Sequence, residues 1–527
     1  MFLTIAIISI LFVTFSYLLL KPYRYWSKNG VKQCSITELF LDNLKLVFRL
    51  VSVQEFTVKL YERFADERYV GIYSFFSPLL YVKDTDLIKQ ITIRDFEHFV
   101  NHIQFLSLDE DPVWARSLVF LPGDAWKAMR ATISPSFTIS KMKGMFGLVK
   151  ECADIFVSYY EENAIKMSKV DANEAFMKYA NDVIASTVFG VTCNSHRDPN
   201  NEFFLMGKRM VDGFWNSVSF ILPYFSPKLA KLLGMHVLNR EATEFFRKLV
   251  KQNINEREKN GIIRMDMIHL LVEAKKGQLR HDESHELDAG FASVQESTIG
   301  RKRYKDLHLS DDDMTAQALV FFFAGFDSSS RSMAFLAYEL ALNPEVQQRL
   351  QDEIDTTLQE CNGSITFDAL LKMKYLDMVI SETLRKWPSI ASIDRVCTKP
   401  YTIQPQRAGD KPININKGDL IWLPIYAIQM DSKRYPQPER FDPERFSNEN
   451  RPQLDPYSYF PFGMGPRSCI GSRFALLEIK TLFFYLLSKF SIITIDKTQI
   501  PLGLSKSQLN LVPSNGIWVG FRSRMHQ

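Results

Sequence analysis

A short run of residues near the C-terminus has the types and spacing of a site that binds a metal through sulfur. Residues 462–471 read FGMGPRSCIG and fit the pattern F-x-x-G-x-R-x-C-x-G. The thiolate of Cys469 can ligate iron, and Phe462 can pack against the sulfur and exclude water. Arg467 can neutralise an anionic substituent such as a haem propionate. Gly465 lacks a Cβ and lets the backbone approach a flat ligand. The run therefore predicts a cysteine-ligated iron site.

The segment that follows Cys469 is expected to be a helix. Residues 472–480 are mostly good helix formers. A cysteine just before a helix N-terminus lies near the positive end of the helix dipole, which favours the thiolate. The alternative is a buried free cysteine without a ligand, the usual role of an isolated cysteine. The complete pattern around Cys469 favours the iron site.

This pattern resembles the cysteine signature of the cytochrome P450 monooxygenases, a haem-thiolate family. The resemblance covers nearly the whole chain and implies a triangular, mainly α fold with a small β portion. In such a fold, haem b lies between a long central helix and the helix after Cys469. Cys469 is the axial ligand of the haem iron. The wording of residues 321–330 is most similar to insect microsomal members that act on foreign compounds.

The resemblance also implies a reaction and its partners. Electrons would come from a membrane-bound NADPH-dependent reductase, with a cytochrome b-type protein as a second donor. Dioxygen and these electrons would be used to hydroxylate or epoxidise an apolar small molecule. Two other functions stay open: a haem-thiolate isomerase or dehydratase that works without dioxygen, and a non-catalytic carrier of haem or a hydrophobic ligand.

A long central helix is expected over residues 310–343, between a serine N-cap followed by three acids and a proline. Its middle, 318–326, is apolar on all sides and should cross the interior. Asp327 and Ser328 follow in that wall, where a buried acid costs stability unless it is paired. A small-residue contact between helices is the alternative explanation. Under the resemblance, Asp327 and Ser328 are the catalytic acid and alcohol of oxygen activation, although the family usually has threonine at the second position.

Arginines in two further places are candidates for binding a carboxylate. Trp126 and Arg130 are spaced i, i+4 on a short helix expected over 124–134, so their side chains point the same way. A core tryptophan beside an exposed arginine is the alternative. Under the resemblance, both bind a haem propionate, and Arg395 matches another position that reaches a propionate.

Glu382 and Arg385 lie at i, i+3 on one helical face, a spacing that is most often a solvated ion pair. The run PERFDPERF follows at 438–446 and contains Arg445. The order and spacing of Glu382, Arg385 and Arg445 resemble the structural triad of the family. The triad would lock the cysteine loop and take no part in the chemistry.

The N-terminus has the composition of a membrane span. Residues 1–20 are uncharged and mostly apolar, and about 20 helical residues cross a hydrocarbon core of about 30 Å. A cleaved signal peptide agrees less well with this sequence, because no basic residue precedes the apolar run and no cleavage site follows it. The basic segment 21–34 places the body on the cytosolic side. The sequence predicts an anchor over 1–20, a juxtamembrane segment over 21–34, and one haem-thiolate monooxygenase domain over 35–527, at the endoplasmic reticulum membrane.

Composition restricts the remaining possibilities. The net charge of +4 on 527 residues gives no case for nucleic-acid binding, and the six scattered cysteines suggest free thiols in a reducing compartment. The 41 phenylalanines indicate a bulky apolar interior or pocket. The aromatic-rich segment 96–121 matches the substrate-contacting loop of the family. A second aromatic-rich segment, 214–225, is a candidate for a second membrane contact. For both segments, ordinary core is the alternative. The stretch over 274–309 is polar and aperiodic and is expected to be a mobile surface loop. Strands are expected over 70–83, 401–403 and 420–422.

Overall fold

The computed structural model describes most of the chain. The described residues are 22–74, 77–104, 111–214, 239–279, 290–294, 299, 309–406, 410–506 and 510–524. The predicted anchor over residues 1–20 lies outside them. Within the described ranges, no helix is both long enough and apolar enough to cross a membrane.

The described part of the chain is mainly helical, as the sequence predicts. Serine side chains begin several helices through capping boxes, at Ser35, Ser52 and Ser310. The helices are α2 (Tyr25–Lys28), α3 (Ile36–Val47), α4 (Val53–Arg63), α5 (Thr85–Lys89), α6 (Gly123–Ile133), α7 (Ile139–Glu161), α8 (Ala164–Met167), α9 (Ala172–Ile184), α10 (Glu202–Phe214), α13 (Arg240–Asn260), α14 (Met267–Lys275), α15 (Asp311–Leu342), α16 (Pro344–Glu360), α17 (Phe367–Lys372), α18 (Lys374–Lys386), α19 (Ile425–Gln429) and α20 (Ser472–Lys489).

The strands form small sheets. They are β1 (Tyr69–Ser74), β2 (Ser77–Val82), β3 (Val170–Asp171), β4 (Ile393–Val396), β5 (Tyr401–Ile403), β6 (Ile413–Ile415), β7 (Leu420–Leu423), β8 (Phe490–Ile493) and β9 (Trp518–Ser523). One sheet has the order β1-β2-β7-β4, a second the order β3-β9-β8, and β5 pairs with β6. In the first sheet β2 and β7 run parallel while the other pairs are antiparallel, so strands distant in sequence lie side by side.

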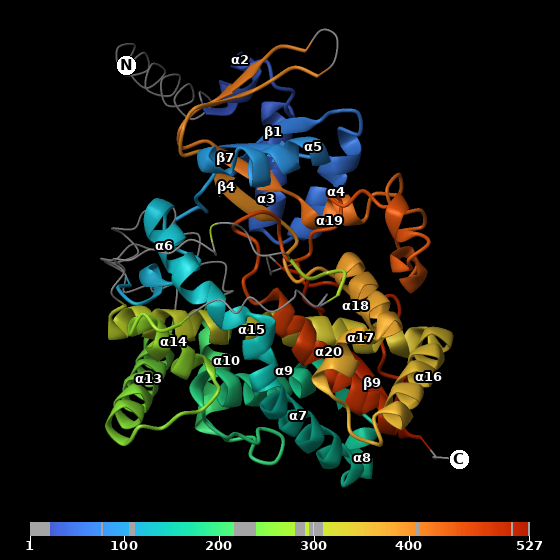
Figure 1. Cartoon of the computed structure of the whole chain (residues 1–527). Helices are drawn as coiled ribbons and strands as arrows, with labels where there is room; N and C mark the ends of the chain where they lie inside the picture. Colours follow the sequence, from blue (N-terminus) through green and yellow to red (C-terminus); the bar gives the residue numbers. More distant parts are fainter. Residues whose placement is uncertain are drawn as a thin grey trace, which may run out of the picture.

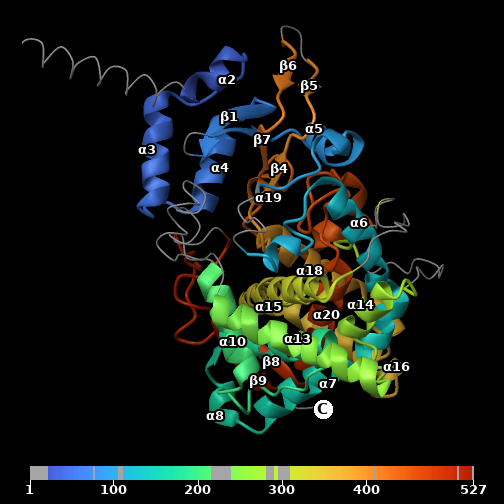
Figure 2. The ribbon, with the colours of Figure 1, turned by 90° about the vertical axis from the view of Figure 1, so that its left-hand side faces the viewer.

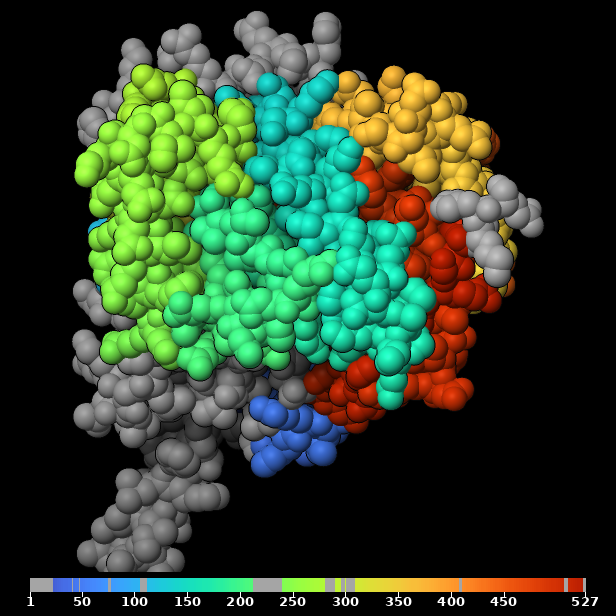
Figure 3. Space-filling view, turned by 90° about the horizontal axis from the view of Figure 1, so that it is seen from below, coloured from blue at the N-terminus to red at the C-terminus, as the bar shows by residue number. Residues whose placement is uncertain are grey.

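The molecule has an upper part with the four-stranded sheet and a lower part of helices. Strands β1, β7 and β4 lie near the top with α2, α3, α4 and α5, and the β5–β6 hairpin projects there (Figures 1 and 2). Helix α15 runs through the middle of the lower part and packs against α9, α13, α18 and α20. Seen from below, α13, α10 and α7, in green to teal, cover much of this face, with residues from the C-terminal part of the chain, in red, beside them (Figure 3).

Several predicted elements are confirmed. The expected long helix is α15, which begins after the N-cap Ser310 and ends at the C-cap Asn343. The expected helix over 124–134 is α6, and the predicted strands correspond to β1, β2, β5 and β7. Burial along α15 is nearly complete, which explains why its sequence shows no single apolar face.

The prediction of a mobile surface loop over residues 274–309 differs from the structure in two respects. Its first two residues end α14, which runs to Lys275. Further along, Ala292 and Ile299 are buried, with exposed fractions of 5% and 7%. The average composition of the segment is polar, but single apolar residues within it are buried against the rest of the protein.

Candidate active site

The loop before α20 presents Cys469. The Cys469 amide donates to the Phe462 carbonyl at 2.8 Å, and the Ser468 amide donates to the Gly465 carbonyl at 2.9 Å. These bonds close the loop into a tight hairpin-like turn. Cys469 is exposed although its neighbours Ser468 and Ser472 are buried. The cysteine therefore opens onto a space enclosed largely by protein.

Gly465 lies where the cysteine loop meets another segment of the backbone. It adopts a left-handed φ of 72°, and a Cβ at this position would overlap the carbonyl oxygen of Thr92. The glycine is needed because the cysteine loop packs against the backbone of the Gln90–Arg94 turn. The structure thus shows a close approach of Gly465 to a neighbouring chain segment, and its approach to a flat ligand stays a prediction.

The thiol of Cys469 is not biased toward the thiolate by the protein alone. Burial raises its pKa, while the amide of Gly471 and the charge of Arg130 act in the opposite direction and offset only part of the effect. With no cation at the sulfur, the pKa of the thiol is therefore raised on balance. A cation bound at the sulfur would supply the missing stabilisation, because coordination favours the deprotonated thiol.

Three arginines from distant segments meet beside this loop. Arg130, on α6, donates from Nη1 to the Ser468 carbonyl at 2.9 Å. Arg395, on β4, is fully buried and donates to the Met464 carbonyl at 3.4 Å. Arg467 donates to the carbonyls of residues 100, 118 and 121 at 2.8, 3.2 and 2.7 Å. The structure thus brings together three residues that were predicted from separate motifs.

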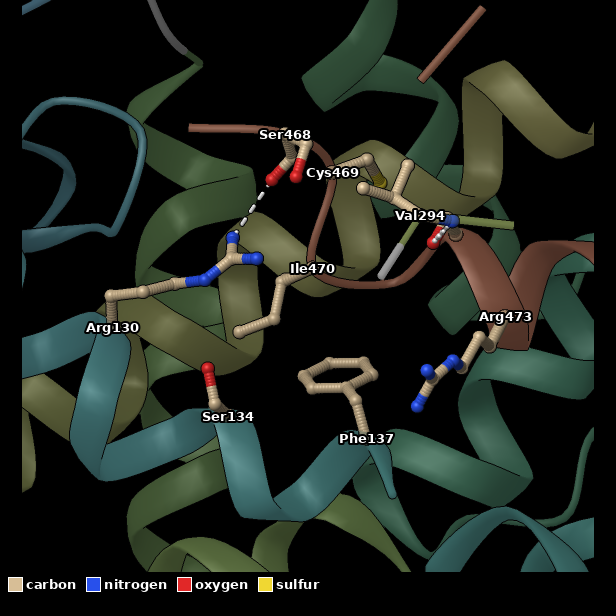
Figure 4. A pocket seen from close by; sticks show the side chains of 9 residues that line it. Arg130, Ser134, Phe137, Val294, Ser468, Cys469, Ile470 and Arg473 are labelled. Atoms are coloured by element: carbon tan, nitrogen blue, oxygen red, sulfur yellow. Dashed lines mark hydrogen bonds between the residues drawn. The ribbon is translucent and has the colours of Figure 1, made fainter. Parts of the chain in front are cut away.

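Trp126 and Phe462 complete this part of the site. Trp126 is 1% exposed, and the Arg467 guanidinium lies 4.0 Å from its ring centroid. The spacing of Trp126 and Arg130 therefore does place both side chains toward the same region. Phe462 is partly buried against the main core, and its carbonyl holds the Cys469 amide. Arg130, Cys469 and Phe137 line one pocket, with Ser134 and Ile470 between them (Figure 4).

Arg467 and Arg395 are buried close to each other, and among the described residues Asp394 offsets their charge only in part. Burial, then repulsion by Arg395 and Arg130, lowers the pKa of Arg467 to about 8, and Asp394 opposes this only in part. Burial lowers the pKa of Arg395 to about 10. Asp394 is itself shared with His102, at 3.1 Å. Such a cluster fits a ligand with carboxylates, because charged hydrogen bonds to an anion would replace the lost hydration.

Helix α15 carries the predicted acid and alcohol. Asp327 is 9% exposed, and its Oδ1 accepts from Nε of Arg331 at 2.9 Å. Ser328 donates from Oγ to the Ala324 carbonyl at 2.6 Å. Ala324 is exposed in the middle of an otherwise buried helix. The helix therefore has a small open face at Ala324 and Ser328, flanked by a buried ion pair.

Arg331 was missed in the sequence analysis. Its signal is the i, i+4 spacing from Asp327, which places both side chains on one helical face. Burial lowers the pKa of Arg331 to about 9. A buried acid needs a counter-charge, and the sequence offered one only a turn away.

The predicted triad is assembled. Glu382 pairs with Arg385 at 2.7 Å and with Arg445 at 3.5 Å. Arg385 also donates to the carbonyl of Gln429 at 2.8 Å, and Gln429 accepts from the amide of Phe460 at 3.2 Å. The triad is thus connected through Gln429 to the start of the cysteine loop, and its role as a lock stays a prediction.

The predicted substrate-contacting loop reaches α15 where it is described. Trp114 packs edge-on against Phe323 at 5.9 Å between ring centroids, and the Leu118 amide donates to Oε1 of Gln317 at 2.9 Å. Residues 105–110 of this loop lie outside the described ranges, as do residues 215–225 of the predicted second membrane contact.

Comparisons with known proteins agree with this geometry. The family model of cytochrome P450 matches residues 42–519. The chain is 41% identical to cytochrome P450 9e2 of Blattella germanica over 522 residues, 96% of this chain and 95% of that protein. The chain belongs to the cytochrome P450 family. It is also 38% identical to probable cytochrome P450 9f2 of Drosophila melanogaster (91% and 92% covered) and 34% identical to cytochrome P450 6k1 of Blattella germanica (95% and 93% covered).

Membership of the P450 family confirms the predicted class of enzyme. The protein is a haem-thiolate monooxygenase, an oxidoreductase that uses cysteine-ligated haem b and electrons from a redox partner. In P450 enzymes the cysteine thiolate pushes electron density toward the iron and favours cleavage of the O–O bond.

Proposed function

We propose that this P450 hydroxylates or epoxidises apolar small molecules, including foreign compounds, with Cys469 as the axial ligand. The observation that supports this most directly is the meeting of Cys469 with a buried, under-balanced arginine cluster. A flat dianionic cofactor ligated by the cysteine would satisfy both, since its carboxylates would pair with guanidinium groups while its metal binds the sulfur. Apolar substrates are favoured by the Trp114–Phe323 contact and the aromatic composition.

Two of the arginines would bind the carboxylates of the cofactor directly. Arg395 would bind a propionate, because its Nε has no hydrogen-bond partner among the described residues. Arg130 would do the same while its Nη1 holds the Ser468 carbonyl. Trp126 would orient Arg467 through the ring contact at 4.0 Å, and Phe462 would keep the cysteine loop closed.

Asp327 and Ser328 would control protons and the oxygen substrate. Ser328 is the hydroxyl on the open face of α15, and Asp327 is the nearest acid on the same turn. For Asp327 to pass on a proton, its carboxylate must leave Arg331 in part, so the ion pair would set how readily the acid is used. Ser328→Ala should divert reducing equivalents from product to hydrogen peroxide.

The cellular setting follows from the N-terminal sequence. Residues 1–20 would anchor the protein in the endoplasmic reticulum, with segment 21–34 and the catalytic body on the cytosolic side. A membrane-bound NADPH-dependent reductase would then be the electron donor, with a cytochrome b-type protein as a second one. Protease added to sealed microsomes should digest the body, and full protection would contradict this orientation.

One experiment separates the proposed reaction from its alternatives. Full-length protein is combined with an NADPH-dependent reductase, and dioxygen uptake, NADPH consumption and product are measured with a panel of apolar substrates. Monooxygenation predicts uptake of dioxygen and product that both depend on NADPH. Product without dioxygen uptake would show an isomerase or dehydratase, and tight binding without any turnover would show a carrier.

A further inference from the structure

The chain between α14 and α15 makes an excursion that its end points do not require. Lys275, the last residue of α14, pairs with Asp311, the first residue of α15, at 2.9 Å between Nζ and Oδ1. A few residues would join these helices. Instead, residues 290–294 lie against α18 and α20, on the cysteine side of the molecule. We call residues 290–294 the strap.

The strap is held by an aromatic contact. The ring of Phe291 stacks on Tyr459 at 5.1 Å between centroids and lies 5.0 Å from Phe446. The Arg451 guanidinium lies 4.4 Å from the ring of Phe291. Aromatic pairs of this kind stabilise a contact beyond the burial of apolar area. Phe291 is therefore the principal anchor of the strap.

Backbone contacts hold the strap as well. The Phe291 amide donates to Oδ2 of Asp377 on α18 at 2.8 Å, and Asp377 pairs with the fully buried Lys480 of α20 at 3.0 Å. Gly290 has a φ of 117°, and a Cβ there would overlap the Asp377 carboxylate. A glycine is therefore required where the strap meets α18.

The last residue of the strap lies at the cysteine. The Val294 amide donates to Oγ of Ser472, the first residue of α20, at 3.5 Å. Val294 lines the same pocket as Cys469, together with Ile470 and Phe137 (Figure 4). An apolar side chain of the strap thus forms part of the wall of the pocket that contains Cys469.

We propose that the strap is a positioning element that shields the sulfur of Cys469 from water and so maintains thiolate ligation. The apolar shell around a metal site controls solvent access to its ligands, and contacts behind a ligand commonly change affinity or activity about 10- to 100-fold. The strap extends the proposed function, because it acts on the cysteine that is assigned as the axial ligand. Phe291 and Gly290 dock the strap, and Val294 provides the shield.

The test uses full-length protein loaded with haem and measures ligation without turnover. The reduced carbon monoxide complex reports thiolate ligation, and its loss is timed in mild denaturant. Hydrogen exchange of the peptide over 290–294 reports whether the strap is docked. Phe291→Ala and Gly290→Ala should both speed exchange and shorten the lifetime of the thiolate-type band about tenfold. Phe291→Tyr keeps the ring and should restore both values.

Two further variants separate shielding from general stability. Val294→Ser should shorten the lifetime of the band while exchange of the strap stays close to that of the parent. Phe245→Ala is the control, because Phe245 is also a partly buried aromatic that packs on a neighbouring ring, Phe246 at 5.1 Å, but lies on α13. It should leave the band lifetime within twofold of the parent.

Two results would overturn the strap proposal. One is faster exchange in Phe291→Ala and Gly290→Ala with an unchanged band lifetime. The other is unchanged exchange in both variants, because the anchors would then not hold the segment. A parent protein with a stable thiolate-type band but no NADPH-dependent product would contradict the proposed reaction and leave the strap test intact.

Discussion

The two sides of the proposed centre balance their buried charge in opposite ways. On α15, Asp327 has its counter-charge, Arg331, one turn away on the same helix. On the cysteine side, Arg130, Arg395 and Arg467 converge from α6, β4 and the cysteine loop. Among the described residues, Asp394 opposes the repulsion at Arg467, and only in part. The first side is electrostatically complete within one helix, whereas the second is suited to an anionic ligand.

The largest expected effect is on the cysteine side. Cys469→Ala removes the sulfur, and no described side chain replaces it among the pocket residues. The thiolate-type band of the reduced carbon monoxide complex should disappear, as measured by difference spectroscopy. Cys397→Ala is the control, since it removes a free thiol that does not line this pocket, and it should keep the band. Retention of the band in Cys469→Ala would show that the ligand lies elsewhere.

The next effect tests the balanced side. Asp327→Asn keeps the shape but removes the ionisable group, so product formation should fall about 100-fold while haem content stays normal. Arg331→Lys retains a positive charge near the acid and should lower the rate far less. The measurement is product formed per unit time under saturating NADPH, with haem quantified in parallel. Equal rates for Asp327→Asn and the parent would show that Asp327 only contributes to helix packing and has no role in proton delivery.

A third change tests whether the arginine cluster exists for a ligand. Arg395→Gln removes a buried charge that the protein offsets only partly, so retention of haem should weaken about tenfold. The stability of the haem-free protein should not fall in proportion, because that charge is costly when unpaired. Haem transfer to an acceptor protein measures retention, and thermal unfolding of the haem-free protein measures stability. A fall in stability alone, with unchanged haem transfer, would assign Arg395 a purely structural role.

Glu478 on α20 extends the comparison to a buried acid that forms no ion pair with the described residues. It is fully buried beside Ser329, and burial raises its pKa to about 8. The unfolded chain releases this proton near pH 4.5, whereas the folded chain keeps it to about pH 8, so stability falls as pH rises between these values.

Glu478→Gln cannot ionise and should remove this loss. Its thermal midpoint should match that of the parent near pH 4.5 and lie increasingly above it toward pH 8. The corresponding gain in the free energy of unfolding should be a few kcal/mol at most. Glu382→Gln is the contrasting variant, because Glu382 is paired with Arg385 and should lose stability when neutralised. A gap between Glu478→Gln and the parent that is independent of pH would contradict the assigned pKa.

Much of the fold was predictable because its signals are local. The limits of α15 follow from a serine N-cap, a run of acids and a proline, which act within a few residues of each end. Asp327 and Arg331 are likewise joined by helical spacing alone. The docking of residues 290–294 was not predictable, since its anchor Phe291 finds its partners more than a hundred residues away at Phe446 and Tyr459.

The sequence by itself determined the family, the cysteine and the residue types that accompany it. The pattern around Cys469 is contiguous, so its chemistry could be interpreted without knowing the fold. Only the tertiary structure decided that Gly465 accommodates the Thr92 backbone and that burial outweighs the helix N-terminus at the thiol. It also decided that Arg130, Arg395 and Arg467 form one cluster. The physical reason is that desolvation and charge repulsion depend on everything packed around a group, and most of that comes from elsewhere in the chain.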